Sequence, residues 1–182
     1  MKGILYYDSK YGTTKAIAEW IKEELTDVQV DMLQITDSMM VRESYDFVIL
    51  GTPIYVGKPR QDFIQFVKRN KEKFPKQLFL FIVTWAASTS YKEKTEGFLE
   101  LIRFYLEPAE IVMEASLPGK LYLDKVSKRD CNSMMRILHR LDLLSDEFDS
   151  KNMTFTDKRN EAESRNFGEC INEYLKKQRR CC

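Results

Sequence analysis

The sequence has little excess charge of either sign. Its 182 residues carry 29 Lys and Arg against 28 Asp and Glu, which gives a formal net charge of +1. Proteins that bind the phosphate backbone of nucleic acids usually have a clear excess of basic groups. We therefore expect no nucleic acid partner.

Long apolar runs are also missing. Residues Met1–Asp8 lead straight into a short apolar segment, without the apolar core and small-residue cleavage site of a signal peptide. The longest apolar run, around Leu78 to Ala87, is well short of the roughly 20 residues that a membrane helix needs. These features predict a cytoplasmic protein with no transmembrane segment.

Cysteine and histidine are scarce and scattered. Cys131 and Cys170 lie far apart, and Cys181 and Cys182 end the sequence. This spacing fits neither a metal cluster nor a disulfide framework, so we expect reduced thiols and no metal site. The single histidine, His139, is expected to be solvated or to cap a helix rather than to contact a substrate.

The sequence does contain a regular alternation of strand and helix patterns. Five segments have the pattern of buried strands: Lys2–Tyr7, Val28–Ile35, Asp46–Leu50, Gln77–Thr84 and Ala109–Leu117. Four segments have apolar residues at helical spacing: Thr14–Leu25, Arg60–Lys71, Thr95–Leu106 and Asn160–Lys177. This order predicts an α/β fold with a doubly wound parallel sheet and helices on both faces. We expect residues 1–182 to form a single domain.

One stretch, at about 118–157, is too long for an ordinary connection between a strand and a helix. Basic side chains flank a set of apolar residues at helical spacing within it. These apolar residues are Met134, Ile137, Leu138, Leu141 and Leu144. We expect an inserted, amphipathic and locally basic excursion. Its helix could pack on the domain or on a second subunit of a homodimer, or it could serve as a substrate lid or a peripheral membrane contact.

The loop after the first strand has the composition of a phosphate site. In a doubly wound sheet, ligands bind beyond the carboxyl ends of the strands, where the strand order reverses. The loop Asp8–Lys15 opens directly into a helix, whose N-terminus offers free N–H groups and a partial positive charge. Gly12 allows close approach, and Ser9, Thr13 and Thr14 add hydroxyls. The alternative is a Ser or Thr N-cap that merely starts the helix.

Two further loops at the same edge combine aromatic and small residues. The loop Gly51–Pro59 contains Tyr55, which could wall a planar ring, and Gly57, which can take a positive φ or change its peptide orientation. The loop Thr84–Ser90 places Trp85 beside small and hydroxylic residues. Each aromatic could instead be ordinary core packing. Three such loops on one edge favour a ligand site.

Three other phosphate chemistries are excluded by the residues present. A nucleotide triphosphate loop of the form G-x-x-x-x-G-K-[ST] is missing, because Gly57-Lys58 is followed by Pro59. A phosphoacceptor domain needs an Asp at the end of the third strand, where Gly51-Thr52-Pro53 stands. The spacing from Cys131 to Arg136 is one residue too short for a cysteine phosphatase.

The first two loops resemble flavodoxins. The phosphate signature [T/S]-x-T-G-x-T of that family is similar to Ser9-x-Tyr11-Gly12-x-Thr14, with Tyr11 in place of the middle threonine. The family's flavin loop after the third strand is similar to Gly51-Thr52-Pro53-Ile54-Tyr55-x-Gly57. The resemblance runs from Lys2 to about Leu117 and resumes in the last helix. It implies a flavodoxin-like sheet of five strands in the order 2-1-3-4-5, with FMN as the cofactor.

The resemblance also implies which residues hold the cofactor. The phosphate would lie at Ser9, Lys10, Tyr11, Gly12, Thr13 and Thr14. The flavin ring would lie near Pro53, Ile54, Tyr55, Val56, Gly57, Thr84, Trp85, Ala86, Ala87 and Ser88. Because Tyr11 replaces a threonine, the Gly12 backbone and the hydroxyls of Ser9 and Thr14 are the expected phosphate contacts.

A closer resemblance is to the flavodoxin-type protoporphyrinogen oxidases. It rests on the long basic excursion and on the segments Asp8–Thr14, Tyr55–Lys58 and Asp62-Phe63-x-x-Phe66-Val67. It implies an FMN-dependent oxidoreductase that acts on a porphyrinogen or quinone, although no residue is identified as catalytic. The alternative is a non-enzymatic electron-transfer protein with a redox partner. The neutral charge balance favours the oxidoreductase, because an acidic shuttle would gather carboxylates around its flavin. A third alternative is a non-enzymatic domain that has lost the ability to bind flavin.

Overall fold

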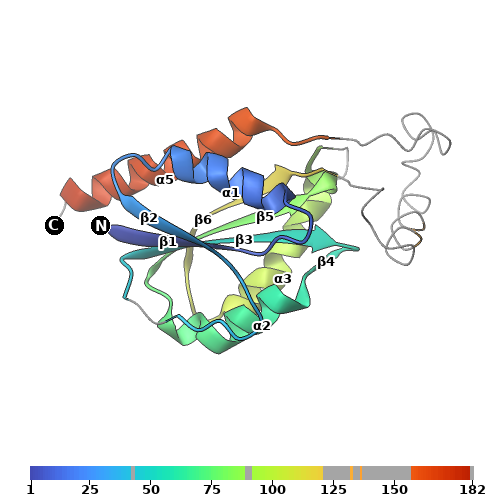
Figure 1. Ribbon diagram of the computed structural model, residues 1–182, viewed down its shortest axis with the longest axis horizontal. Coiled ribbons are helices and arrows are strands. Elements are labelled where there is room, and N and C mark those ends of the chain that lie inside the picture. Colours follow the sequence, from blue (N-terminus) through green and yellow to red (C-terminus); the bar gives the residue numbers. More distant parts are fainter. Residues whose placement is uncertain (42–43, 89–91, 121–131, 133–135, 137–156, 181–182) are drawn as a thin grey trace.

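A computed structural model describes residues 1–41, 44–88, 92–120, 132, 136 and 157–180 (Figure 1). Its main sheet contains five parallel strands: β1 (Lys2–Tyr7), β2 (Gln29–Gln34), β3 (Phe47–Tyr55), β5 (Gln77–Thr84) and β6 (Ile111–Pro118). A two-residue strand, β4 (Lys58–Pro59), pairs antiparallel with the end of β3.

The strands of the sheet follow the order β2-β1-β3-β5-β6, and every neighbouring pair is parallel. Counted among the parallel strands alone, this is the predicted order 2-1-3-4-5, so the predicted fold class is confirmed. The chain moves outward from β1 to β2 and then returns to β3 on the other side of β1. The strand order therefore reverses at the carboxyl ends of β1 and β3, where a ligand site is expected.

Helices cover both faces of the sheet. The α-helices are α1 (Thr13–Glu23), α2 (Gln61–Asn70), α3 (Glu96–Leu106) and α5 (Glu161–Arg180). Short 3-10 helices are η1 (Lys71–Lys73), η2 (Trp85–Ser88) and η3 (Lys92–Thr95). Figure 1 shows α1 and α5 over one face and α2 and α3 over the other. None of the described helices is both long enough and apolar enough to cross a membrane.

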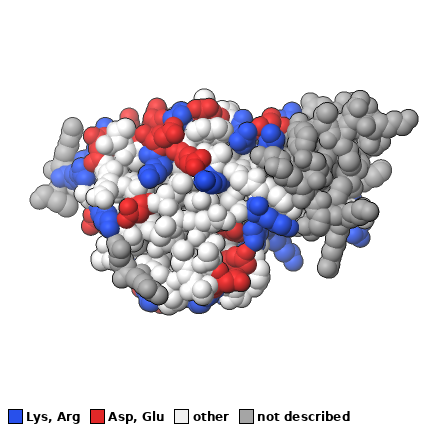
Figure 2. Space-filling view, in the orientation of Figure 1, with Lys and Arg blue, Asp and Glu red and all other residues white. Residues whose placement is uncertain are grey.

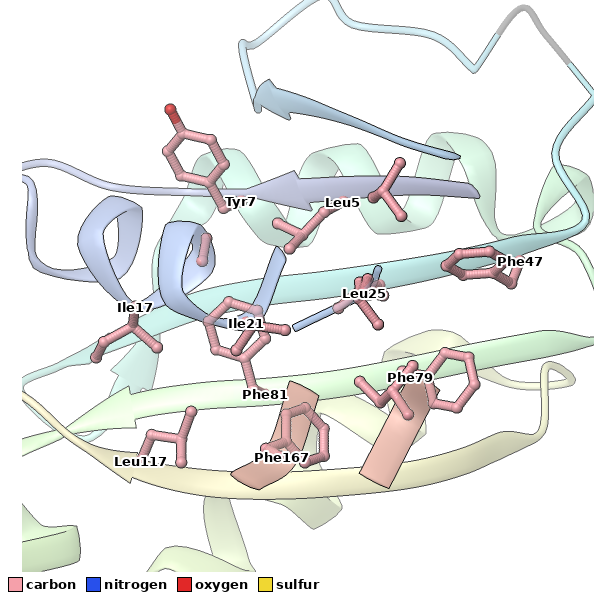
Figure 3. Close-up of a cluster of buried hydrophobic side chains, with 14 of the residues drawn as sticks. Leu5, Tyr7, Ile17, Ile21, Leu25, Phe47, Phe79, Phe81, Leu117 and Phe167 are labelled. Carbon is pink, nitrogen blue, oxygen red and sulfur yellow. The ribbon is translucent and has the colours of Figure 1, made fainter. Parts of the chain in front are cut away.

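Alternate side chains of each central strand enter two separate cores, as expected for strands buried on both faces. On β1, Leu5 and Tyr7 belong to the core under α1 and α5 (Figure 3), whereas Ile4 and Tyr6 belong to the core under α2 and α3. The central strands are aromatic-rich on the first face, where Phe81 is fully buried. This packing fixes the strand ends that carry the candidate site.

Helix α5 lies unusually close to α1 at Gly168. A Cβ atom added there would lie 2.6 Å from the backbone oxygen of Ile21, so only glycine allows this approach. Arg165, at the same interface between α1 and α5, forms ion pairs with Glu23 and Glu24. These contacts fix the position of α1, whose N-terminus faces the edge described below.

The predicted loop Gly51–Pro59 is largely wrong as a loop. Residues Gly51–Tyr55 continue β3, and Lys58–Pro59 return as β4, so the segment is a β-hairpin. The reason is that β5 runs alongside and pairs with β3 as far as Pro53 and Val83. Local Gly and Pro signals predicted an earlier end, because they do not report a neighbouring strand.

Most of the predicted excursion at 118–157 lies outside the described residues, including most of its predicted helix and His139. The two ends of this segment are described. Lys120 and Asp157 form an antiparallel bridge and an ion pair of 3.2 Å. The excursion therefore leaves and rejoins the fold at adjacent points.

Candidate functional site

The first loop turns tightly around Gly12. Ser9 is buried, and its Oγ accepts a hydrogen bond of 3.1 Å from the Gly12 N–H. The side-chain amide of Gln34, from β2, donates to the Ser9 carbonyl at 2.9 Å. Gly12 has φ 89° and ψ −11°, a left-handed conformation that glycine adopts without steric cost. The chain thereby reverses within a few residues and enters α1.

The N-terminus of α1 has no side-chain cap. Gly12 is the N-cap residue, so the alternative of a Ser or Thr N-cap is wrong. The first turn of α1 also has no acidic residue, whereas those of the other described α-helices contain Asp62, Glu96 or the pair Glu161 and Glu163. An uncapped N-terminus with a partial positive charge and no compensating carboxylate is suited to an anion.

Tyr11 has a role that the sequence did not predict. Its ring packs edge-on against Tyr55, with ring centroids 6.0 Å apart and an interplanar angle of 84°. The ammonium group of Lys10 lies 5.0 Å from the Tyr11 ring centroid. Because Tyr11 follows β1 and Tyr55 ends β3, this aromatic pair joins the first predicted loop to the second.

The second predicted loop is a hairpin with a strained turn. Ile54 pairs with Pro59 and Tyr55 with Lys58, which leaves Val56 and Gly57 at the turn. Both have a positive φ, 52° and 76°, as a type I′ turn requires. The predicted positive φ of Gly57 is confirmed. A β-branched residue such as Val56 rarely adopts this conformation.

The third predicted loop begins on β5, which neighbours β3. Thr84 is buried and its Oγ1 accepts a hydrogen bond of 3.3 Å from the Ala86 N–H. Ser88 Oγ donates to the Trp85 carbonyl at 2.8 Å and closes η2. The Trp85 Nε1 donor is buried and has no hydrogen-bond partner among the described residues. Thr89 and Ser90 lie outside those residues.

A buried charge lies at the junction of the first two loops. Asp8 is only 1% exposed, its N–H donates to the Gly51 carbonyl at 2.8 Å, and its carboxylate lies 3.3 Å from Arg60. Arg60 also pairs with Asp62. Burial raises the pKa of Asp8 to about 6, although the Arg60 guanidinium opposes this shift. Asp8 and Arg60 are not among the site residues predicted from the sequence. The signal that could have found Asp8 is a lone charge that ends an apolar strand.

The segment after β6 also reaches this edge. The Gly119 N–H donates to the Thr84 carbonyl at 3.2 Å. A Cβ atom added at Gly119 would lie 3.8 Å from the Thr13 side chain. The excursion therefore begins next to the first and third loops. No local sequence signal marks this contact, because it is created by the tertiary fold.

The predicted site residues thus lie at the carboxyl ends of three adjacent strands (Figure 1). The first two loops touch through Tyr11 and Tyr55 and through Asp8 and Arg60. Figure 2 shows Lys and Arg side chains on this part of the visible face. Among the described residues there is no group of three or more His, Cys, Asp or Glu that could hold a metal ion.

Comparisons with solved structures reveal the same fold. A flavodoxin from the domain Archaea aligns with 97% of this chain and 99% of its own, at 17% identity and a TM-score of 0.53. Streptococcus pneumonia TIGR4 flavodoxin aligns over 79% of this chain and 99% of its own, at 16% identity and a TM-score of 0.51. Two-electron reduced Megasphaera elsdenii flavodoxin aligns over 74% and 95%, at 17% identity and a TM-score of 0.50.

A comparison with curated protein sequences found no match. The model of the flavodoxin domain family matches residues 4–141, which include all three predicted loops. This match supports the sequence-based prediction of FMN as the cofactor. The chain belongs to the flavodoxin domain family.

Proposed function

We propose that the chain binds FMN at the carboxyl edge of the sheet and works as a redox flavoprotein. The observation that carries this proposal is the N-terminus of α1, which has neither a side-chain cap nor an acidic residue in its first turn. Backbone N–H groups there suit a phosphate. We assign the phosphate to Ser9, Lys10, Tyr11, Gly12, Thr13 and Thr14.

The two loops on β3 and β5 fit the remainder of the cofactor. Tyr55 and Trp85 supply aromatic surface, and the buried Trp85 Nε1 is a donor that a ligand rich in oxygen and nitrogen acceptors would satisfy. We assign the ring to the segments 53–57 and 84–88. When bound, FMN supplies the electron-transfer chemistry, and the protein residues hold and orient it.

The charge of the first two loops favours an enzyme over an acidic electron carrier. Segments 9–15 and 51–60 contain Lys10, Lys15, Lys58 and Arg60 and no Asp or Glu. Arg60 pairs with Asp8 and Asp62, and Lys15 with Glu19, so Lys10 and Lys58 carry the argument. A basic rim would attract an anionic substrate such as a porphyrinogen, whose side chains carry carboxylates, and it would not steer a basic partner protein. We therefore propose an FMN-dependent oxidoreductase, with a porphyrinogen or a quinone as the substrate class. Electron transfer to a redox protein is the second candidate.

The first experiment compares FMN with riboflavin. Purified protein should quench the fluorescence of FMN on titration and should bind FMN far more tightly than riboflavin, which lacks the phosphate. Equal affinities would reject the phosphate site. The absence of any quenching, together with a colourless preparation, would reject flavin binding altogether.

The second experiment separates the two redox roles. Anaerobic reduction of the FMN-loaded protein should proceed without accumulation of a one-electron form if it is an oxidoreductase of two-electron substrates. The reduced protein should then be reoxidised rapidly by a quinone, or the oxidised protein should be reduced by a porphyrinogen. Stable accumulation of the one-electron form, with neither substrate reacting, would favour the electron carrier.

A further inference from the structure

A buried ion pair connects the end of β1 to the base of the hairpin. Asp8 directly follows β1, and Arg60 directly follows β4 and serves as the N-cap residue of α2. Their charged groups are 3.3 Å apart. The second carboxylate oxygen of Asp8, Oδ2, is buried and has no hydrogen-bond partner among the described residues. A buried carboxylate with an unpartnered oxygen is costly, so its ionised form depends on Arg60.

The charged groups that act on the Asp8 carboxylate both come from the start of α2. Arg60 lowers the pKa of Asp8, and Asp62, on α2, raises it. A hydrogen bond from the Ser9 backbone also lowers it. The neighbouring contacts at Gly51 on β3 and Gln34 on β2 are uncharged. Within the described structure, Arg60 is thus the main group that favours ionised Asp8.

The β3–β4 hairpin, which precedes Arg60, has a strained turn that needs stabilising contacts. Val56 has a φ of 52°, a conformation that costs free energy in a β-branched residue and persists only where the surroundings enforce it. Its side chain is 48% exposed and so gains little from packing. Two described contacts tie this hairpin to the first loop, namely Tyr55 with Tyr11 and Arg60 with Asp8. The second of these depends on charge.

We propose that Asp8 and Arg60 are positioning residues whose ion pair holds the β3–β4 hairpin against the first loop, and that protonation of Asp8 releases this hold. A proton from solvent adds to the Asp8 carboxylate, the pair loses its attraction, and Arg60 keeps Asp62 as its partner. The role of the pair in retaining flavin rests on the function proposed above. The hold on the hairpin itself does not.

The first test uses ligand-free protein. The pKa of Asp8, about 6, lies in a range where protein NMR is practical. The backbone amide signals of Tyr55, Val56 and Gly57 should titrate with a midpoint near that value. Asp8→Asn should abolish the titration. Asp62→Asn should move the midpoint to lower pH, because the Asp62 charge raises the Asp8 pKa.

A matched control is Glu114→Gln, which breaks a carboxylate–arginine pair on β6, away from the site. This variant should titrate as the wild type does. Hairpin signals that do not titrate, or that titrate equally in Asp8→Asn, would overturn the proposal. If Asp8→Asn fails to fold, the direction of the Asp62→Asn shift decides.

The second test measures FMN affinity between about pH 5 and about pH 8. The phosphate of FMN itself takes up a proton near pH 6, so the comparison must be between variants. The dissociation constant should rise on acidification about threefold more in the wild type than in Asp8→Asn. Identical profiles would overturn the link to flavin. If no variant binds FMN at any pH, the proposed function fails, while the NMR titration still decides whether the pair holds the hairpin.

Discussion

Helices α1 and α5 pack side by side on one face of the sheet, yet they begin in opposite ways (Figure 1). At the start of α5, the side-chain oxygen of Asn160 accepts a hydrogen bond of 3.0 Å from the Glu163 N–H. Its first turn contains Glu161 and Glu163. At the start of α1, Gly12 offers no side chain and no carboxylate follows.

The difference separates a helix end that is satisfied within the protein from one that is open to a ligand. A side-chain cap stabilises a helix by about 0.5–2 kcal/mol, and a first-turn carboxylate adds about 0.3–1 kcal/mol. Helix α1 lacks both, although its C-terminal end is fixed by ion pairs with α5.

Gly12→Asp should cause the largest change. No heavy atom lies within 4 Å of an added Cβ at Gly12, so the side chain fits, and its charge would compete with a phosphate for the helix N-terminus. We expect FMN affinity to fall at least about 100-fold, or about 2.8 kcal/mol, with riboflavin affinity little changed. Fluorescence titration measures both.

Gly12→Asn is the matched control, because it imposes the same backbone strain without the charge. Gly97→Asp places the same carboxylate in the first turn of α3, where the added Cβ again meets nothing. Both should retain most of the preference for FMN over riboflavin. If Gly12→Asn loses as much affinity as Gly12→Asp, charge is not the reason that α1 lacks a cap.

Asp8→Asn should stabilise the protein near neutral pH. The pKa of Asp8 is raised to about 6 from an ordinary 3.8, so ionisation of Asp8 is less favourable in the folded state. Stability from this group is present below about pH 4 and is lost as the pH rises through about 6. Removal of the charge should therefore raise the unfolding free energy at neutral pH. The lost pairing with Arg60 offsets part of this gain, so we expect a net gain of about 1–2 kcal/mol.

Urea unfolding as a function of pH measures this effect. As the pH rises from about 4 to about 6, the unfolding free energy of the wild type should fall relative to that of Asp8→Asn. Parallel stability profiles for the two proteins would show that Asp8 does not titrate in this range. A more stable variant would show that ionised Asp8 lowers the stability of the protein at the candidate site. The capped N-terminus of α5, by contrast, adds stability.

Asn160→Ala should cost about 1 kcal/mol of unfolding free energy, because it removes the cap of α5. FMN affinity should not change, since Asn160 lies outside the three predicted loops. Urea unfolding and FMN titration of the same preparation test the two halves of this expectation. A loss of FMN affinity comparable to the loss of stability would contradict the division between the two helix ends.

Val56→Asn should have the smallest effect. Asn followed by Gly is the favoured pair for a type I′ turn, and Asn tolerates a positive φ better than Val does. We expect a gain of about 0.5 kcal/mol in the unfolding free energy, measured by urea unfolding. A loss of stability would mean that the exposed Val56 side chain contributes packing that outweighs its backbone strain.

The regular elements of the fold were predictable because they depend on local patterns. Strand β1 and strand β5 have the predicted bounds, since buried strands on both faces of a sheet are continuous apolar runs. The position of Gly12 at a turn before α1 was also predictable. The N-cap identity was not certain from sequence, because Ser9, Thr13 and Thr14 offered equally plausible caps.

The contacts between loops were not predictable, because residues far apart in sequence create them. The Tyr11–Tyr55 pair explains an apparent departure from the flavodoxin motif, and only the fold brings these rings together. The Asp8–Arg60 pair has the same origin. The hairpin β3–β4 was missed because the Gly51-Thr52-Pro53 signal suggested a loop, while pairing with β5 extended the strand.

The bridge and ion pair between Lys120 and Asp157 bring the two ends of the 118–157 excursion together. Closing a loop of twice the length costs only about 0.6 kcal/mol more. A change in the length of the segment between these two residues therefore carries little entropic cost, beside the proposed flavin site.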